Sequence, residues 1–158
     1  MTDNYIGIMI ESLRRKKDVL TDILKLSEEQ SLLLDDPNLE PDTFEKNVNR
    51  KAALIEKLEQ LDTGFESLYD KVKEELESNR DIHKEQIRQM QELIRALTEF
   101  NMQIQATEAR NKEKATAKFA YIRQQAKEIR SSQKIVKEYY NNMMHKAYNE
   151  PHFLDNKK

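Results

Sequence analysis

Side chains that could bind a metal or perform thiol chemistry are few in this chain. It has three histidines, His83, His145 and His152, and no cysteine. Metal ligands usually stand at helical or short-loop spacing, and His83 is far in sequence from the other two. The absence of cysteine removes disulfides, thiol catalysis and Cys-ligated zinc. We therefore predict no metal site and interpret the histidines as surface or interface residues.

Motifs for catalysis are missing as well. Two glycines in the whole sequence cannot build a glycine-rich phosphate loop or a nucleophile elbow. Carboxylates are plentiful, but no pair stands apart from the ion-pair pattern that is ordinary on helix surfaces. The sequence predicts neither an enzyme nor a bound cofactor.

Aromatic and methionine side chains gather near the C-terminus. Tyr139, Tyr140, Met143 and Met144 stand at helical spacing, which by default indicates core. Flexible methionine and amphipathic tyrosine also suit a surface that accepts a partner helix. Both interpretations remain open at this point.

The elements that carry these residues must be long helices. Pro37 and Pro41 bracket a short break, and residues 42–150 contain no proline and a single glycine. A chain with so few turn residues cannot reverse direction often. We predict an all-α fold, an elongated antiparallel helical bundle of three long helices, the third overhanging with a C-terminal amphipathic segment.

The first predicted helix spans about residues 5–34. Apolar residues recur there every seven positions, with Ser27 as the polar exception; they are Ile6, Leu13, Leu20 and Leu34. The second helix is expected to open at Asp42, with Glu45 completing a capping box. Lys51 and Asp62 are polar positions on its apolar track. The track runs unbroken through Gly64, and a reversal is expected near residues 78–79.

The third predicted helix spans residues 81–146. Its apolar track is interrupted by Glu108 and Asn111 and resumes from Ala115 to Met143. At 1.5 Å per residue the three helices would measure roughly 45, 55 and 100 Å, so the first two cannot cover the third. We predict a bundle over 1–112, a C-terminal amphipathic extension for a partner or a dimer over 113–146, and a flexible tail over 147–158.

Charge is distributed unevenly along the chain. Residues 1–100 hold 23 acidic and 15 basic side chains, a net charge of −8, whereas residues 101–158 hold 6 acidic and 12 basic ones, a net charge of +6. The basic residues are interspersed with glutamates, which favours a solvated helix face over a nucleic-acid site. No apolar run approaches the ~20 residues that span a bilayer, and no secretory signal is visible. We expect a cytoplasmic protein that binds no nucleic acid and does not insert in membranes.

Three runs of sequence are similar to the FlgN family of flagellar export chaperones, in the form found in clostridia-like bacteria. They are KAALIEKLEQLDTGFESLYDKV at 51–72, IQATEARNK at 104–112 and FLDNKK at 153–158. Each run is rich in Glu, Lys and Leu, but their joint order is fairly specific, and the similarity covers almost the whole chain.

The resemblance implies a chaperone that keeps hook–filament junction proteins unassembled and delivers them to the flagellar type III export apparatus. In such chaperones the C-terminal part binds the C-terminal helical segment of the client, by helix-in-groove recognition. The residues expected to line the client site are Phe119, Ile122, Ile129, Val136, Tyr140 and Met143. The basic charges around them suggest an acidic partner. The alternative is a structural coiled-coil dimer or scaffold that uses the same stripe on a second copy.

Overall fold

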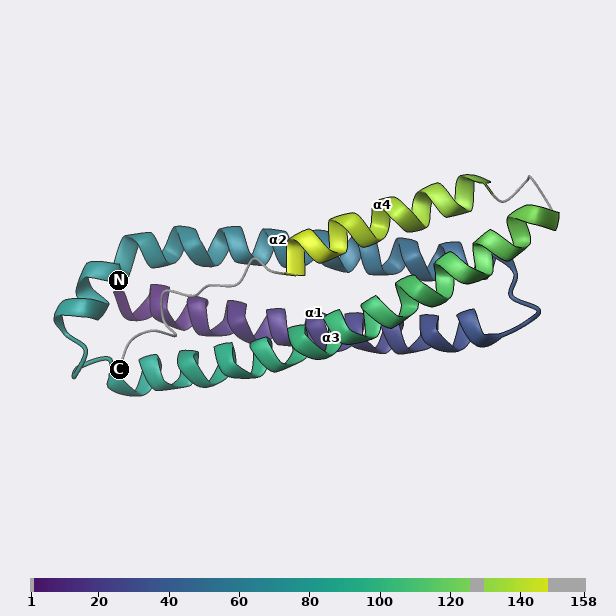
Figure 1. Cartoon of the computed structure of the whole chain (residues 1–158). Helices are drawn as coiled ribbons and strands as arrows, with labels where there is room; N and C mark the ends of the chain where they lie inside the picture. Colours follow the sequence, from purple (N-terminus) through teal and green to yellow (C-terminus); the bar gives the residue numbers. More distant parts are fainter. Residues whose placement is uncertain (1, 126–129, 148–158) are drawn as a thin grey trace.

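The computed structural model describes residues 2–125 and 130–147 of the chain, and these form four helices. They are α1 (Thr2–Asp35), α2 (Pro41–Ser78), α3 (Lys84–Gln125) and α4 (Arg130–Ala147). In Figure 1, α1 and α3 run in one direction along the molecule, and α2 and α4 run in the other. The prediction of an all-α helical bundle is confirmed.

The start of α2 differs from the expected capping box. The helix begins at Pro41, and the N-cap residue is Glu40, whose side chain makes no capping hydrogen bond. Proline fits the first turn of a helix because its fixed φ is already helical and its missing N–H would have no intrahelical partner. Asp42 therefore lies inside the first turn, where its charge is favourable next to the helix dipole.

The reversal between α2 and α3 lies where the sequence predicted it. α2 ends at Ser78, and the Asn79 backbone N–H donates to the Glu75 carbonyl at 2.9 Å. The buried His83 ring lies 3.0 Å from a Glu75 carboxylate oxygen and 3.7 Å from one of Asp3. His83 thus ties the first turn of α1 to the turn between α2 and α3.

One apolar core runs through all four helices. The predicted tracks supply it, and its members in the described residues include Ile6, Leu13, Leu20, Phe44, Ile55, Phe65, Ile94, Ile104, Ala115, Phe119, Val136 and Tyr140. α2 passes through Gly64 without a break, as predicted. The polar Asp62 on the inner track accepts a hydrogen bond from Lys16 across α1 and α2 at 2.7 Å.

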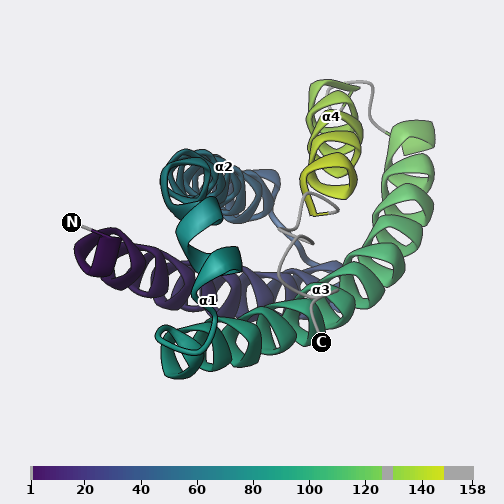
Figure 2. The same ribbon diagram turned by 90° about the vertical axis from the view of Figure 1, so that its left-hand side faces the viewer.

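The prediction of one continuous third helix to about residue 146 is wrong. α3 ends at Gln125, and α4 starts at Arg130 and runs back between α2 and the C-terminal half of α3 (Figure 2). Folding back covers apolar surface on α3 that would otherwise face water, which is favourable by roughly 25 cal/mol per Å². Residues 126–129 contain neither glycine nor proline, so turn chemistry gave no sign of the reversal.

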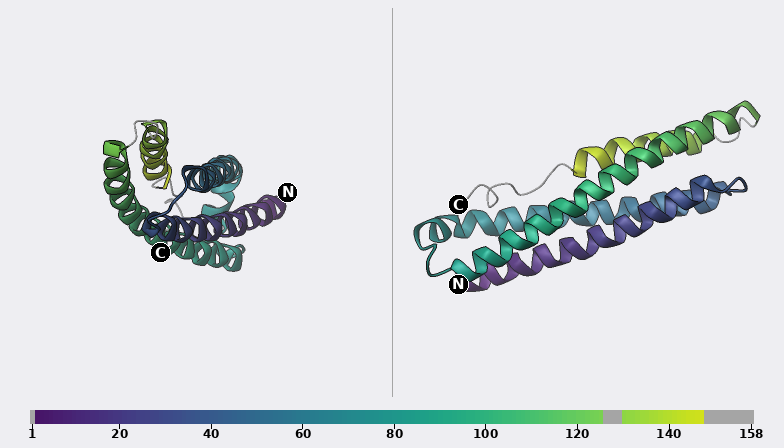
Figure 3. Two further views of the ribbon diagram at one scale, coloured as in Figure 1. Left: turned by 90° about the vertical axis from the view of Figure 1, so that its right-hand side faces the viewer. Right: turned by 60° about the horizontal axis from the view of Figure 1, so that its bottom comes forward.

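α3 does not stay beside α1 along its whole length. It starts beside α1 and diverges toward its C-terminal end, where α4 accompanies it (Figure 3). The proposed division between residues 1–112 and 113–146 stays a prediction, although Phe119 and Val136 belong to the same core as α1 and α2. Most of the predicted tail, residues 148–158, lies outside the described residues.

Candidate functional site

The predicted site residues lie on the two helices of the α3–α4 hairpin. Phe119, Val136, Tyr140 and Met143 are buried, and Ile122 is half-buried against the core. Ile129 lies outside the described residues. The sequence predicted that these side chains would be uncovered, but the packing of α4 against α2 and α3 buries most of the described ones.

Phe119 is held by an aromatic contact with α2. Its ring meets that of Phe44 edge to face, with 5.2 Å between centroids. Such pairs add about 0.5–1.5 kcal/mol to the effect of burial. Phe44 stands in the first turn of α2, so this pair anchors the C-terminal half of α3 to the start of α2.

A groove of about 350 Å³ opens between α3 and α4. Three of the predicted residues, Phe119, Val136 and Tyr140, line it. The other lining residues are Lys112, Ala115, Thr116, Ala120, Arg123, Gln133, Lys137 and Asn141. The described lining therefore combines an apolar floor with three basic and no acidic side chains. Met143 and Ile122 are not among its lining residues.

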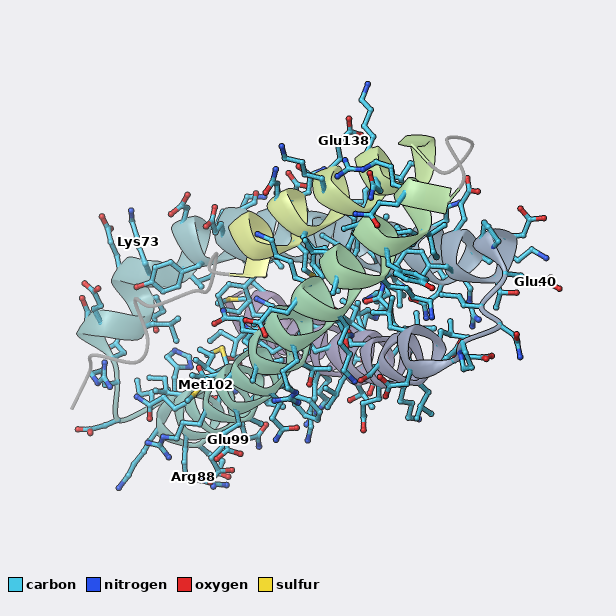
Figure 4. All side chains as sticks on the ribbon, turned by 45° about the vertical axis from the view of Figure 1, so that its right-hand side comes forward. Glu40, Lys73, Arg88, Glu99, Met102 and Glu138 are labelled. Carbon is cyan, nitrogen blue, oxygen red and sulfur yellow. The ribbon has the colours of Figure 1, made fainter. Side chains whose placement is uncertain are left out.

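The outer face of α4 is charged and exposed. Glu138 points away from the bundle, on the side of α4 remote from α1 (Figure 4). Buried Tyr139 and Tyr140 follow directly in sequence. The helix is thus amphipathic, with its apolar side turned into the molecule.

Beneath α4 lies a polar cluster formed by Gln30, Lys51, Glu108, Asn111 and Ser27. The Lys51 ammonium donates to Glu108 Oε1 at 2.5 Å and to Gln30 Oε1 at 2.7 Å. The Asn111 amide donates to the Ser27 carbonyl at 2.8 Å, and the Ser27 hydroxyl donates to Glu108. All five residues have a relative exposure of 0%. We call this group the polar cluster.

α4 contributes its two tyrosines to the polar cluster. The Tyr140 hydroxyl donates to Gln30 Oε1 at 3.0 Å, and the Lys51 Nζ lies 4.7 Å from the centroid of the Tyr139 ring. The Tyr139 hydroxyl interacts electrostatically with the Glu108 carboxylate, although it has no partner within hydrogen-bond geometry. The polar cluster therefore joins α1, α2, α3 and α4.

Burial dominates the electrostatics of the polar cluster. Desolvation lowers the pKa of the Lys51 ammonium from 10.5, and the neighbouring Glu108 carboxylate partly opposes this change. Burial also raises the pKa of the Tyr139 and Tyr140 hydroxyls above 10.0, and the charge of Glu108 adds to the effect. Both tyrosines stay neutral at physiological pH.

Four members of the polar cluster are visible in the sequence, each as a single polar residue on an apolar track. Ser27, Lys51, Glu108 and Asn111 each interrupt an apolar track, and such interruptions are the available signal. Gln30 gave no comparable signal and was missed. The apolar periodicity of one helix does not show which polar residues of the other helices lie next to its own polar positions. The cluster itself was therefore not predicted.

No metal centre is visible among the side chains that the structure describes. They contain no grouping of three or more histidine or carboxylate side chains suited to hold an ion. No described helix combines the length and apolarity needed to cross a bilayer.

Comparison with known proteins adds the family. The family model described as FlgN protein matches residues 1–146, which includes all four helices nearly to the end of α4. This chain belongs to the FlgN family. FlgN proteins act generally as flagellar export chaperones. No curated protein and no solved structure matches this FlgN chain.

Proposed function

We propose that this FlgN chain is a cytoplasmic chaperone for hook–filament junction proteins. It binds their C-terminal helical segments, keeps these segments unassembled and delivers the clients to the flagellar type III export apparatus. The observation that carries the proposal is the groove between α3 and α4, which offers an apolar floor beside a basic rim.

The dimensions of the groove suggest how a client helix binds. A volume of about 350 Å³ is at the lower end of ligand pockets, roughly 300–1,000 Å³. It accommodates apolar anchor side chains of a helix, while the helix itself lies across the hairpin. Recognition of this kind presents anchors at helical spacing.

The six predicted site residues keep their proposed role in this arrangement. Phe119, Val136 and Tyr140 form the floor that receives the anchors. Ile122, Ile129 and Met143 belong to the same stripe of the sequence, and they add contacts with the client beside this floor.

Charge complementarity sets the chemistry of the client. Lys112, Arg123 and Lys137 line the groove, and the Arg123 guanidinium donates to Gln133 at 3.4 Å. A client segment with apolar anchors flanked by aspartate or glutamate matches this rim. Charges on the rim speed association and select among partners more than they add to affinity.

The proposal is tested by reversing the rim charges. The probe is a synthetic peptide of the C-terminal segment of a hook–filament junction protein from the same genome. Replacing Lys112, Arg123 and Lys137 together by glutamate should weaken binding by about tenfold or more, because three attractions become repulsions of up to about 1 kcal/mol each. Isothermal titration calorimetry on the full-length protein measures the effect.

A matched control uses a second groove, between α1 and α2. Lys25, Arg50 and Lys57 line that groove, and the same triple replacement there should leave peptide binding unchanged. Equal loss in both variants would indicate a response to net charge alone. If the rim variant binds as the wild type does, the groove between α3 and α4 is not the client site. If the wild type binds no such peptide, the client class is wrong.

A further inference from the structure

Tyr140 has two roles in the structure that depend on opposite ends of one side chain. It is a lining residue of the groove between α3 and α4. Its hydroxyl reaches the polar cluster and donates to Gln30 Oε1 at 3.0 Å. The position of this groove residue is therefore tied to a residue of α1, which contributes no residue to the described groove lining.

Gln30 is the point at which several donors converge. Its Oε1 accepts from Lys51 Nζ at 2.7 Å, from the Tyr140 hydroxyl at 3.0 Å and from the Asn111 amide at 3.3 Å. Lys51 belongs to α2, Asn111 to α3 and Tyr140 to α4. One amide oxygen on α1 thus receives a donor from each of the other three helices.

Apolar packing alone leaves the register of α4 weakly determined. Its buried described side chains are Val136, Tyr139, Tyr140 and Met143, and an apolar stripe of this kind can slide or rotate along an apolar groove at modest cost. A buried polar contact works differently, because a displaced partner leaves unpaired polar atoms in the core. Single buried polar residues fix register in coiled coils for this reason.

We propose that Gln30 is a positioning residue for α4 and, through the Tyr140 hydroxyl, for the wall of the client groove. The part that concerns the client rests on the proposed function. Gln30 does not touch the client; it fixes the ring of Tyr140 and the register of α4 relative to α3. The anchors of the client then meet a groove of defined shape, which lowers the ordering cost of binding.

The experiment compares Gln30→Met, Tyr140→Phe and the double variant in the full-length protein. Hydrogen–deuterium exchange of the α4 amides should be about 5- to 10-fold faster in Tyr140→Phe, as expected for loss of one buried hydrogen bond. It should be at least as fast in Gln30→Met, which also removes the acceptor of Lys51 and Asn111. The double variant should exchange no faster than Gln30→Met alone, because that change has already broken the bond to the Tyr140 hydroxyl.

Binding of the hook–filament junction peptide is the second readout. Each single variant should bind it about 5- to 10-fold more weakly. Tyr69→Phe removes a hydroxyl from a buried tyrosine of α2 that is not part of the groove lining. It is the control, and it should leave both α4 exchange and binding unchanged.

The outcomes separate the two proposals. Unchanged α4 exchange in both single variants, or faster exchange spread equally over α1 to α4 in Tyr140→Phe, would overturn the positioning role. Faster α4 exchange with unchanged peptide affinity would overturn the link to the client groove. Faster α4 exchange in a protein that binds no peptide at all would support the positioning of α4 and remove the proposed function.

Discussion

Lys51 and Glu108 form an ion pair whose side chains are both 0% exposed. Taking two charges out of water costs several kcal/mol, and mutual attraction repays this cost only while both partners are present. Polar neighbours reduce the cost further, since Lys51 donates to Gln30 and Ser27 donates to Glu108. The pair is therefore sensitive to the loss of one member and tolerant of the loss of both.

Removal of one partner should be strongly destabilising. Glu108→Leu leaves the Lys51 ammonium buried without its counter-charge, and we expect a loss of about 3–5 kcal/mol in the free energy of unfolding. Glu99→Leu is the matched control, because Glu99 is an exposed glutamate on the same helix (Figure 4), and it should change stability by less than about 0.5 kcal/mol. Urea unfolding followed by circular dichroism measures both.

The double variant Lys51→Met with Glu108→Leu should recover most of that loss. Replacing a buried ion pair by apolar residues of similar size is often neutral or stabilising. A double variant as unstable as Glu108→Leu alone would contradict this expectation. It would mean that the remaining polar groups, Gln30 and Ser27, require the pair for their own hydrogen bonding.

The two tyrosines of α4 make a prediction about pH. Burial raises the pKa of Tyr139 and Tyr140 above 10.0, so above about pH 10 the unfolded chain loses protons that the folded protein retains. Stability contributed by these hydroxyls is therefore complete below pH 10 and is lost as pH rises above it. Tyr139→Phe with Tyr140→Phe should flatten this alkaline loss, measured by thermal melting between pH 8 and 11.

Lys51 has the opposite effect on the pH dependence of stability below about pH 10.5. Its lowered pKa means that the unfolded chain binds the extra proton, so its contribution to stability rises with pH up to about 10.5. Comparison of wild type with the tyrosine variant cancels the Lys51 contribution. An alkaline loss of equal size in both proteins would show that other groups cause it.

Among the helices, the α3–α4 hairpin determines which surfaces a client meets. The C-terminal half of α3 is held by the Phe44–Phe119 contact, and α4 returns against α2 and α3. The same hairpin carries the groove. Its removal should therefore separate client binding from folding of the remaining bundle.

A chain truncated after Lys112 should stay helical and melt cooperatively, at a lower temperature than the full-length protein. α1, α2 and residues 84–112 of α3 retain most of the apolar core, whereas the polar cluster loses its cover of Tyr139 and Tyr140. Circular dichroism during heating checks both points. An unfolded truncated chain would show that residues 113–146 are an integral part of the bundle and not an extension.

At the level of the whole molecule, the basic C-terminal region adjoins a more acidic bundle. Residues 101–158 carry a net charge of +6 and residues 1–100 carry −8. Among the described residues, Lys114 of the basic region pairs with Asp35 of the acidic region at 3.0 Å. The Lys51–Glu108 pair has the opposite arrangement, with its base in the first region and its acid in the second. Part of the basic charge is thus paired with acidic residues of the same chain. The three basic side chains at the groove rim present positive charge to a partner.

We expect the free protein to be a monomer. The apolar stripe that would form a coiled-coil dimer is covered within the same chain, because α4 packs against α2 and α3; Phe119, Val136, Tyr140 and Met143 are all buried. Sedimentation equilibrium at micromolar concentration should give the mass of one chain. A stable dimer that binds no client peptide would instead favour the structural coiled-coil alternative.

The sequence by itself determined the all-α class, the helix reversal near residues 78–79 and most of the core. Proline and glycine placement and apolar periodicity are local properties, and each helix displays them without reference to its neighbours. The same local signals located the stripe from Phe119 to Met143 and the polar interruptions at Lys51 and Glu108.

Only the tertiary structure decided that α4 folds back, that Gln30 joins the polar cluster and that a basic-rimmed groove remains between α3 and α4. The reversal after Gln125 has no glycine or proline to announce it, and its free-energy gain comes from covering apolar surface on other helices. Contacts between residues about 80 to 110 positions apart, such as Ser27 with Glu108 and Gln30 with Tyr140, depend on helix packing. Periodicity within a single helix does not encode that packing.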